Sequence, residues 1–154
     1  MDKENKLRYL SVNNVLGFLT SKPTGMSPNE LCARIYEIGL NFKAEFLDEV
    51  YSDGPIFFKM FLTSKDKEDL DDLIIFTSIG NELNRKEENL KHLIYENHLL
   101  VKSEDFVTTL PNDLTGYYNA LLEKYKENYN TIEVYHVLYM IDDEVFVDVY
   151  SEVE

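Results

Sequence analysis

The last stretch of the chain, residues 131–154, most constrains the fold because it contains two apolar arms that match each other around one turn. Residues 131–141 and 144–153 are rich in β-branched and aromatic side chains and flank Asp142-Asp143, which is typical of a β-hairpin. If the two arms fold about Asp142-Asp143 as a two-residue turn, one face of the hairpin is almost wholly apolar. This face pairs Met140 with Val145, Leu138 with Val147, His136 with Val149, Val134 with Ser151 and Ile132 with Val153.

The opposite face of this hairpin is aromatic and acidic, because successive side chains of a strand point to opposite sides. A slip of one residue would turn the apolar set toward water, so the register is strongly specified. A two-residue type I′ turn prefers Asn-Gly or Asp-Gly, and a wider loop from Ile141 to Glu144 would keep the same pairing. The second face pairs Tyr139 with Phe146, Val137 with Asp148, Tyr135 with Tyr150 and Glu133 with Glu152.

The rest of the chain reads as mostly helical. The motif Ser27-Pro28-Asn29-Glu30 is a capping box that predicts a helix over 28–38, with Gly39 as its end. Bulky residues predict a strand over 56–62, and the run 99–109 predicts a small hairpin. Apolar spacing and caps predict further helices over 8–20, 41–50, 66–79, 84–97 and 114–129.

These elements predict an α+β fold with a helix-rich N-terminal part, short strands and a C-terminal antiparallel β-hairpin. At 154 residues the chain suits a single compact domain, residues 1–154, with sub-lobes 1–62 and 63–154. The order of three helices followed by a short strand pair occurs over 8–62 and again over 70–109. This order is loosely similar to winged-helix modules, and the similarity implies winged-helix-like units.

The charge is strongly acidic and concentrated toward the C-terminus. The formal net charge is −14, and after Lys126 the sequence has eight acidic residues and no Lys or Arg. Such a field repels phosphate and attracts basic surfaces, so direct nucleic-acid binding is not expected and a basic protein partner is. The simpler alternative is that the charge only keeps a small protein soluble.

Composition also bears on the compartment. The first residues contain no apolar run typical of a secretory signal, and no window has the unbroken apolar length of a membrane span. The single cysteine, Cys32, cannot form an internal disulfide and is expected in the core. We therefore expect a soluble, cytoplasmic protein.

No residue set matches a catalytic, cofactor-binding or metal-binding signature, so we expect a protein that is not an enzyme and has no cofactor. His92 and Glu96 could share a helix face, but this is half of a metal site and no second half is present. His136 falls on the apolar face of the hairpin, where a hydrogen-bonded core histidine is the expected role. No Gly-rich phosphate loop or Gly-x-Ser-x-Gly elbow is present.

The sequence therefore favours a small binding protein that blocks a basic partner, as an inhibitor or nucleic-acid mimic. The first alternative is a transcriptional regulator built on winged-helix-like units, and the second is a self-assembling structural protein or homodimer that uses the edge of the last strand. If the helix over 114–129 instead covers the aromatic face of the hairpin, the tyrosines of that face are ordinary core residues. The predicted partner-binding residues are Glu133, Tyr135, Tyr139, Asp142, Asp143, Glu144, Phe146, Asp148, Tyr150 and Glu152.

Overall fold

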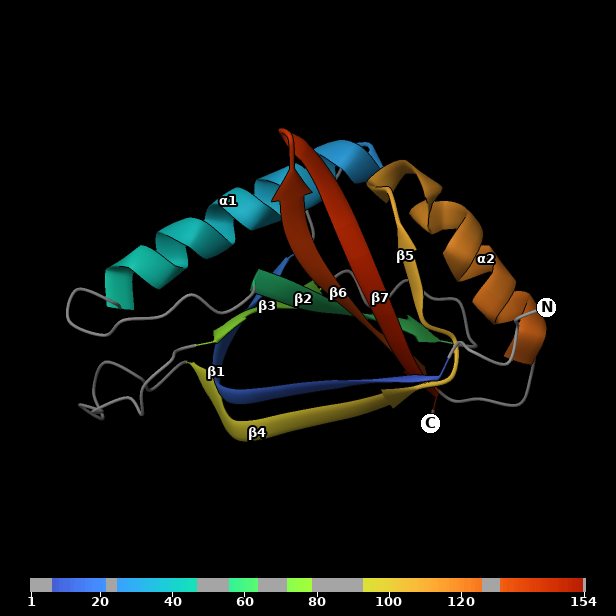
Figure 1. Cartoon of the computed structure of the whole chain (residues 1–154), viewed down its shortest axis with the longest axis horizontal. Helices are drawn as coiled ribbons and strands as arrows, with labels where there is room; N and C mark the ends of the chain where they lie inside the picture. The colour runs from blue at the N-terminus through green and yellow to red at the C-terminus, as the bar shows by residue number, and fades with distance from the viewer. Residues whose placement is uncertain are drawn as a thin grey trace.

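In the residues that it describes, the computed structural model shows a curved antiparallel sheet with two α-helices on one side of it (Figure 1). The structure describes residues 7–21, 25–46, 56–63, 72–78, 93–125 and 131–153. The helices are α1 (Pro28–Phe46) and α2 (Leu114–Tyr125), and a short 3-10 helix, η3 (Pro111–Asp113), precedes α2. The strands are β1 (Arg8–Ser21), β2 (Ile56–Thr63), β3 (Asp72–Ser78), β4 (Ile94–Ser103), β5 (Val107–Thr109), β6 (Thr131–Ile141) and β7 (Glu144–Val153).

The sheet has the strand order β4-β1-β3-β2-β6-β7-β5. One segment of chain supplies both ends of this order, because β4 pairs with β1 and β5 pairs with β7. At the bend between them, the buried Ser103 hydroxyl oxygen accepts a hydrogen bond of 3.0 Å from the backbone N–H of Ser151 on β7. The sheet therefore curls until a single bent segment joins its two ends.

The order strand, helix, strand, strand occurs twice along the chain. The first copy is β1-α1-β2-β3 and the second is β4-α2-β6-β7, with β5 and η3 inserted before α2. Strands from both predicted sub-lobes, 1–62 and 63–154, belong to the same sheet, because β2 pairs with β6.

The C-terminal hairpin is confirmed with the predicted register. Each predicted pair, from Ile132 with Val153 to Met140 with Val145, is present. The turn is the two-residue form, and both of its residues have positive φ, 54° at Asp142 and 69° at Asp143. The predicted strand over 56–62 and a helix beginning at Leu114 are also present.

The predicted helix-rich N-terminal part is wrong, because most of the described chain before α2 is strand. The segment predicted as a helix over 8–20 is β1, and residues 72–78 of the predicted 66–79 helix are β3. Apolar residues recur through both segments at spacings that fit either structure, and pairing with distant strands decides the outcome. β3 pairs with β1 along one edge and with β2 along the other. Its side chains enter the apolar clusters on both faces of the sheet, so its run Leu-Ile-Ile-Phe is the near-continuous apolar pattern of a central strand.

The remaining corrections concern pairing and helix length. Residues 94–97 begin β4 rather than ending a helix, and the proposed helix start at Asn84 lies outside the described residues. β4 and β5 do not form a hairpin with each other. The helix that begins at Pro28 continues through Gly39 to Phe46. The predicted winged-helix-like units are also wrong, because within the described residues β1 and β3 stand where each unit was expected to begin with a helix.

Two apolar clusters hold the fold together, one on each face of the sheet. The larger lies beneath the helices and combines Cys32 and Ile35 of α1 with Leu121 of α2 and strand residues such as Phe58 and Val134. Gly39 lets α1 approach β2, because a Cβ at this position would lie 2.4 Å from Cγ2 of Ile56. The smaller cluster contains only strand residues on the opposite face: Leu10, Val12, Val15, Phe57, Phe76, Val101 and Tyr135.

Candidate functional site

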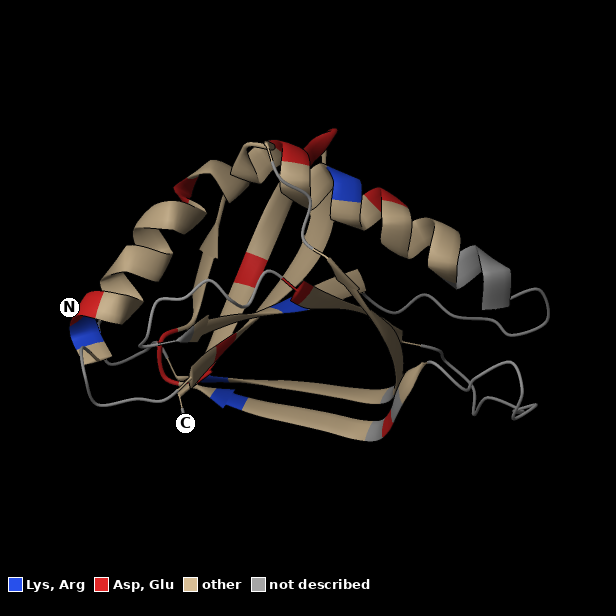
Figure 2. Cartoon of the chain, turned by 180° about the vertical axis from the view of Figure 1, so that it is seen from behind, with Lys and Arg blue, Asp and Glu red and all other residues tan. Residues whose placement is uncertain are grey.

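The predicted acidic and aromatic residues of the hairpin lie on the face opposite the helices, except for those at its tip. The apolar face of the hairpin, including Ile132, Val134 and Leu138, belongs to the cluster that α1 and α2 cover. The predicted helix over 114–129 begins with α2, and α2 covers the apolar face of the hairpin. The alternative in which this helix covers the aromatic face is therefore wrong for the described residues. Figure 2 shows acidic segments at the tip of the hairpin and part-way along its strands.

Tyr135 is buried, although we expected it to lie on an exposed interaction surface. Only 3% of Tyr135 is exposed, because the curled sheet brings β1 and β4 over this face and places Leu10 and Val101 in the same cluster. The pKa of Tyr135 is raised, mainly by burial and to a smaller extent by the nearby carboxylates of Glu133, Glu152 and Glu96. The centre of the predicted surface is thus a second, partly polar core.

A lysine from the neighbouring strand is held at the edge of this second core. The Lys59 ammonium lies 3.4 Å from Oε1 of Glu133, and the Tyr135 hydroxyl donates to the same oxygen at 3.2 Å. The ammonium also lies 5.3 Å from the ring centroid of Phe61 and 5.2 Å from that of Tyr135, which is the range of cation–π attraction. We call Phe61, Glu133 and Tyr135 the Lys59 cage.

The Lys59 cage is partly shielded from water. The side chains of Lys59 and Glu133 are 17% and 18% exposed, so their attraction is screened less than that of a surface pair. Glu152 lies directly opposite Glu133 on β7, and like charges opposed across strands repel. The pair of Lys59 and Glu133 is therefore partly buried, and the carboxylate of Glu152 is carried on the next strand.

The outer part of the same face is held by its own hydrogen bonds. Asp148 accepts one from the Tyr139 hydroxyl at 3.0 Å and one from the Thr108 hydroxyl at 2.8 Å, and the Tyr139 and Phe146 rings stack at 5.9 Å. Tyr150 packs against Phe106 of the bend before β5 at 4.9 Å. β5 covers the edge of β7 over Val147–Val149, which shortens the open edge that the self-assembly hypothesis needs.

The three acidic residues at the hairpin tip are separate from this face. Asp142, Asp143 and Glu144 are exposed at the hairpin turn, and Asp143 and Glu144 border a cavity beside α1. The structure thus brings seven of the ten predicted partner-binding residues to one face and sends three to another place. No partner is present, so a partner-binding role for these residues stays a prediction.

Sequence reasoning missed the residues that β2 contributes. β2 supplies both Lys59 and the cage residue Phe61. The sequence of this segment, Ile-Phe-Phe-Lys-Met-Phe-Leu, indicated only a buried strand. A single lysine within such an apolar run was the available signal, because a charge in a buried strand requires a partner. Its partner is 74 residues away along the chain and could not be named from the sequence.

Two further expectations about single residues are confirmed. His136 is fully buried; its Nδ1–H donates to the Phe58 carbonyl oxygen at 3.3 Å, and its Nε2 accepts from the Tyr118 hydroxyl at 2.7 Å. Cys32 is fully buried, and burial raises the pKa of its thiol to about 12. Within the described ranges, no group of three or more His, Cys, Asp or Glu residues could hold a metal ion, and no helix is long and apolar enough to cross a membrane.

Comparison with known proteins shows a fold but not a family. No protein-family model matches the chain, and no curated protein matches it. Among solved structures it is similar to the crystal structure of the EcmrR C-terminal domain, with a TM-score of 0.56 and 11% identity, over 96% of both chains.

The chain is also similar to EcmrR in a cryo-EM structure of the EcmrR–DNA complex in EcmrR-RPo. The TM-score is again 0.56 at 11% identity, over 96% of this chain and 57% of that one. At this identity the likeness shows the fold alone.

Proposed function

We propose that this chain is a non-enzymatic regulatory domain in transcription control that binds a positively charged effector at the Lys59 cage. The fold supports the first part of the proposal, because a domain aligned over 96% of its length occurs in EcmrR, a protein that is seen in complex with DNA. The observation that carries the second part is the position of the Lys59 ammonium between Glu133 and two aromatic rings.

The cage already binds an ammonium group, which defines the chemistry that it accepts. Aromatic rings attract quaternary and primary ammonium ions through their negative faces, and a partly buried carboxylate adds direct charge attraction. The carboxylate of the cage, Glu133, is already paired with the Lys59 ammonium. An effector cation would therefore compete with Lys59 or lie beside it.

The DNA contact would come from another domain or another protein. A net charge of −14 opposes the phosphate backbone, whose neutralisation supplies most of the affinity of DNA-binding surfaces. The matched part of the EcmrR chain in the DNA complex is 57% of that chain, so a protein of this kind has room for a second domain. The role left for this chain is to sense a signal.

Binding of choline, compared with its neutral carbon analogue 3,3-dimethylbutan-1-ol, tests the proposed site. We expect choline to bind detectably by calorimetry and the alcohol to bind at least tenfold more weakly, because only choline carries the charge. E133Q should weaken choline binding about tenfold, and K59M should strengthen it by removing the internal competitor. E104Q removes one exposed charge elsewhere and should have no effect.

Equal binding of choline and the alcohol, or unchanged choline binding by E133Q, would overturn the effector site. The regulatory role is tested separately by transcript profiling of host cells with and without the chain. We expect a small set of transcripts to change. An unchanged profile, with capture of a basic enzyme whose activity the chain blocks, would instead favour an inhibitor.

A further inference from the structure

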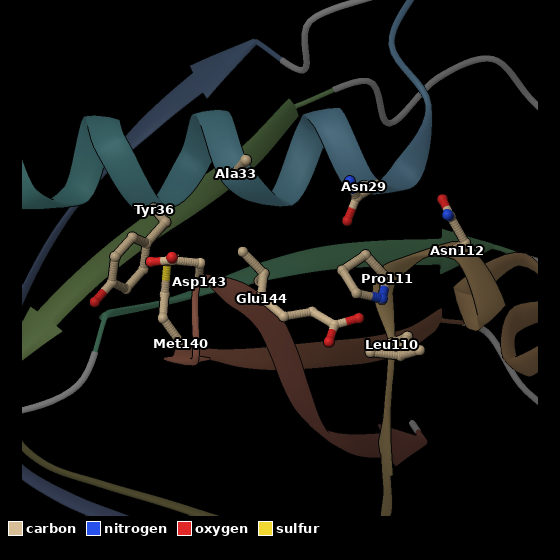
Figure 3. A pocket seen from close by; sticks show the side chains of 10 residues that line it. Asn29, Ala33, Tyr36, Leu110, Pro111, Asn112, Met140, Asp143 and Glu144 are labelled. Carbon is tan, nitrogen blue, oxygen red and sulfur yellow. The ribbon is translucent and has the colours of Figure 1, made fainter.

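We infer that a cavity between the hairpin tip, α1 and η3 is a second binding site, which accepts a small organic ammonium ion with an apolar body. This inference goes beyond the proposed function, because the cavity lies at the helix-covered side of the sheet and shares no residue with the Lys59 cage. Figure 3 shows side chains from three separate elements converging on it.

The cavity has the size of a small-molecule site. Its volume is about 370 Å³, and pockets that hold small ligands usually range from about 300 to 1,000 Å³. Ala33 and Tyr36 line it from α1, Leu110 and Pro111 from the start of η3, and Met140 from the end of β6. A ligand with fewer than about a dozen non-hydrogen atoms would fit this volume.

The charge lining the cavity selects a cation. Asp143 and Glu144 border it, and among the described residues that line it there is neither Lys nor Arg. Within the described part of the chain, neither carboxylate has a side-chain hydrogen bond or ion pair, in contrast to Glu133 and Asp148 on the other face. Figure 3 shows the Glu144 side chain extended toward Leu110 and Pro111, along the space that a ligand would occupy.

The remaining lining favours a ligand with an apolar body over a bare metal ion. Met140 is 43% exposed and Leu110 is 37% exposed, so both leave apolar surface in contact with water at the cavity. Covering such surface stabilises a complex by about 25 cal/mol for each Å². Asn29 and Asn112 also line the cavity, and their side-chain amides are hydrogen-bonding groups.

The backbone of the turn holds one of the carboxylates at this position at the expense of stability. Asp142 and Asp143 have φ of 54° and 69°, a region in which Asn-Gly is the preferred pair for a two-residue hairpin turn. A glycine at position 143 would relieve the strain and remove the charge. D143G should therefore raise the melting temperature by about 2–3 °C while weakening ligand binding.

Methyl-labelled methionine provides a local readout of the site. The chain has four methionines, of which Met140 lines the cavity and Met60 is buried in the core. Titration with benzylamine, a cation at pH 7, should shift the Met140 methyl signal with a Kd of roughly 0.1–1 mM and leave Met60 unchanged. Benzyl alcohol has a similar shape without the charge and should shift the Met140 signal at least tenfold less.

Matched variants separate this site from a non-specific acidic surface. D143G and E144Q should each raise the Kd for benzylamine about threefold to fivefold, and the double variant about tenfold or more. E104Q removes an exposed charge away from the cavity and should leave the Kd unchanged. Because D143G is expected to be more stable than the natural chain, its loss of binding cannot be attributed to unfolding.

Three results would overturn the inference: no shift of Met140, an equal shift with benzyl alcohol, or an equal loss of binding in E104Q. Its outcome is independent of the proposed function. E133Q, which removes the charge of the Lys59 cage, should leave the Met140 response intact. The tip cavity and the cage can therefore fail separately.

Discussion

Protonation of His136 should destabilise the protein as the pH falls from 7 to 5. The imidazole is fully buried between β2 and α2, and burial lowers its pKa from 6.5 to about 3, although the hydrogen bonds to the backbone of Phe58 and Val134 act in the opposite direction. The groups that contact it carry no compensating negative charge at these pH values. The neighbouring Tyr118 hydroxyl, whose pKa burial raises, stays neutral, and so does Cys32, which lies near Tyr118.

The sign follows from proton linkage. A histidine whose pKa is lower in the folded state binds its proton more readily after unfolding, so its contribution is fully present above pH 6.5 and is lost as the pH falls toward 3. At pH 5 the unfolded imidazole is about 97% protonated and the folded one is almost entirely neutral. The free energy of unfolding should therefore fall by about 2 kcal/mol between pH 7 and pH 5 through His136 alone.

Urea denaturation followed by circular dichroism at the two pH values measures this effect. Other groups of the chain also bind protons as the pH falls, so the relevant quantity is the difference between the natural chain and H136Q, whose glutamine stays neutral. H136Q should lose about 2 kcal/mol less between pH 7 and pH 5.

The reasoning would be refuted if H136Q and the natural chain had the same pH dependence. Where H136Q folds too poorly to measure, the ring proton of His136 in the natural chain gives a second test. Its NMR chemical shift should not change between pH 7.5 and pH 5. A titration step in this range would show that the folded state accepts the proton and would remove the predicted effect.

Three further predictions concern local packing. G39A should destabilise the protein by about 1–3 kcal/mol despite the better helix propensity of alanine, because the added Cβ would lie 2.4 Å from Cγ2 of Ile56. G116A in α2, where no atom lies within 4 Å of the added Cβ, should stabilise it by about 1 kcal/mol, and thermal unfolding of both variants checks the contrast. S27A should destabilise the protein by about 1 kcal/mol in urea, because the Ser27 hydroxyl accepts from the Glu30 N–H at 3.2 Å; equal stability would refute a role for this cap. Because burial raises the pKa of Cys32 to about 12, iodoacetamide should label the thiol only in urea, and rapid labelling of the native protein would contradict its burial.

The hairpin and the start of α1 could be predicted because their determinants are close in sequence. The two arms of the hairpin specify one register through their matched faces, and the chain reaches that register around a two-residue turn. The reciprocal hydrogen bonds between Ser27 and Glu30 lie within one helical turn, so the motif alone identifies the helix start. In both cases a short stretch of chain contains both partners of the interaction.

The strands β1 and β3 could not be predicted because their partners are far away in sequence. Arg8 pairs with Ser103 and Val15 with Ser78, and the apolar spacing of these segments is compatible with a helix when the partners are unknown. Gly17 shows the same dependence, since a Cβ there would lie 2.5 Å from Cδ1 of Phe76 on the paired strand. The identity of these elements is a property of the assembled sheet.

The candidate sites divide in the same way. The sequence alone determined the acidic and aromatic composition of one hairpin face, because side chains alternate along a strand. It also determined that three acidic residues lie at the turn. Only the tertiary structure brought Lys59 to Glu133, curled the sheet over Tyr135 and set α1 beside the hairpin tip. The physical reason is that alternation is a local rule of the backbone, whereas burial and cavity shape depend on which distant segments pack together.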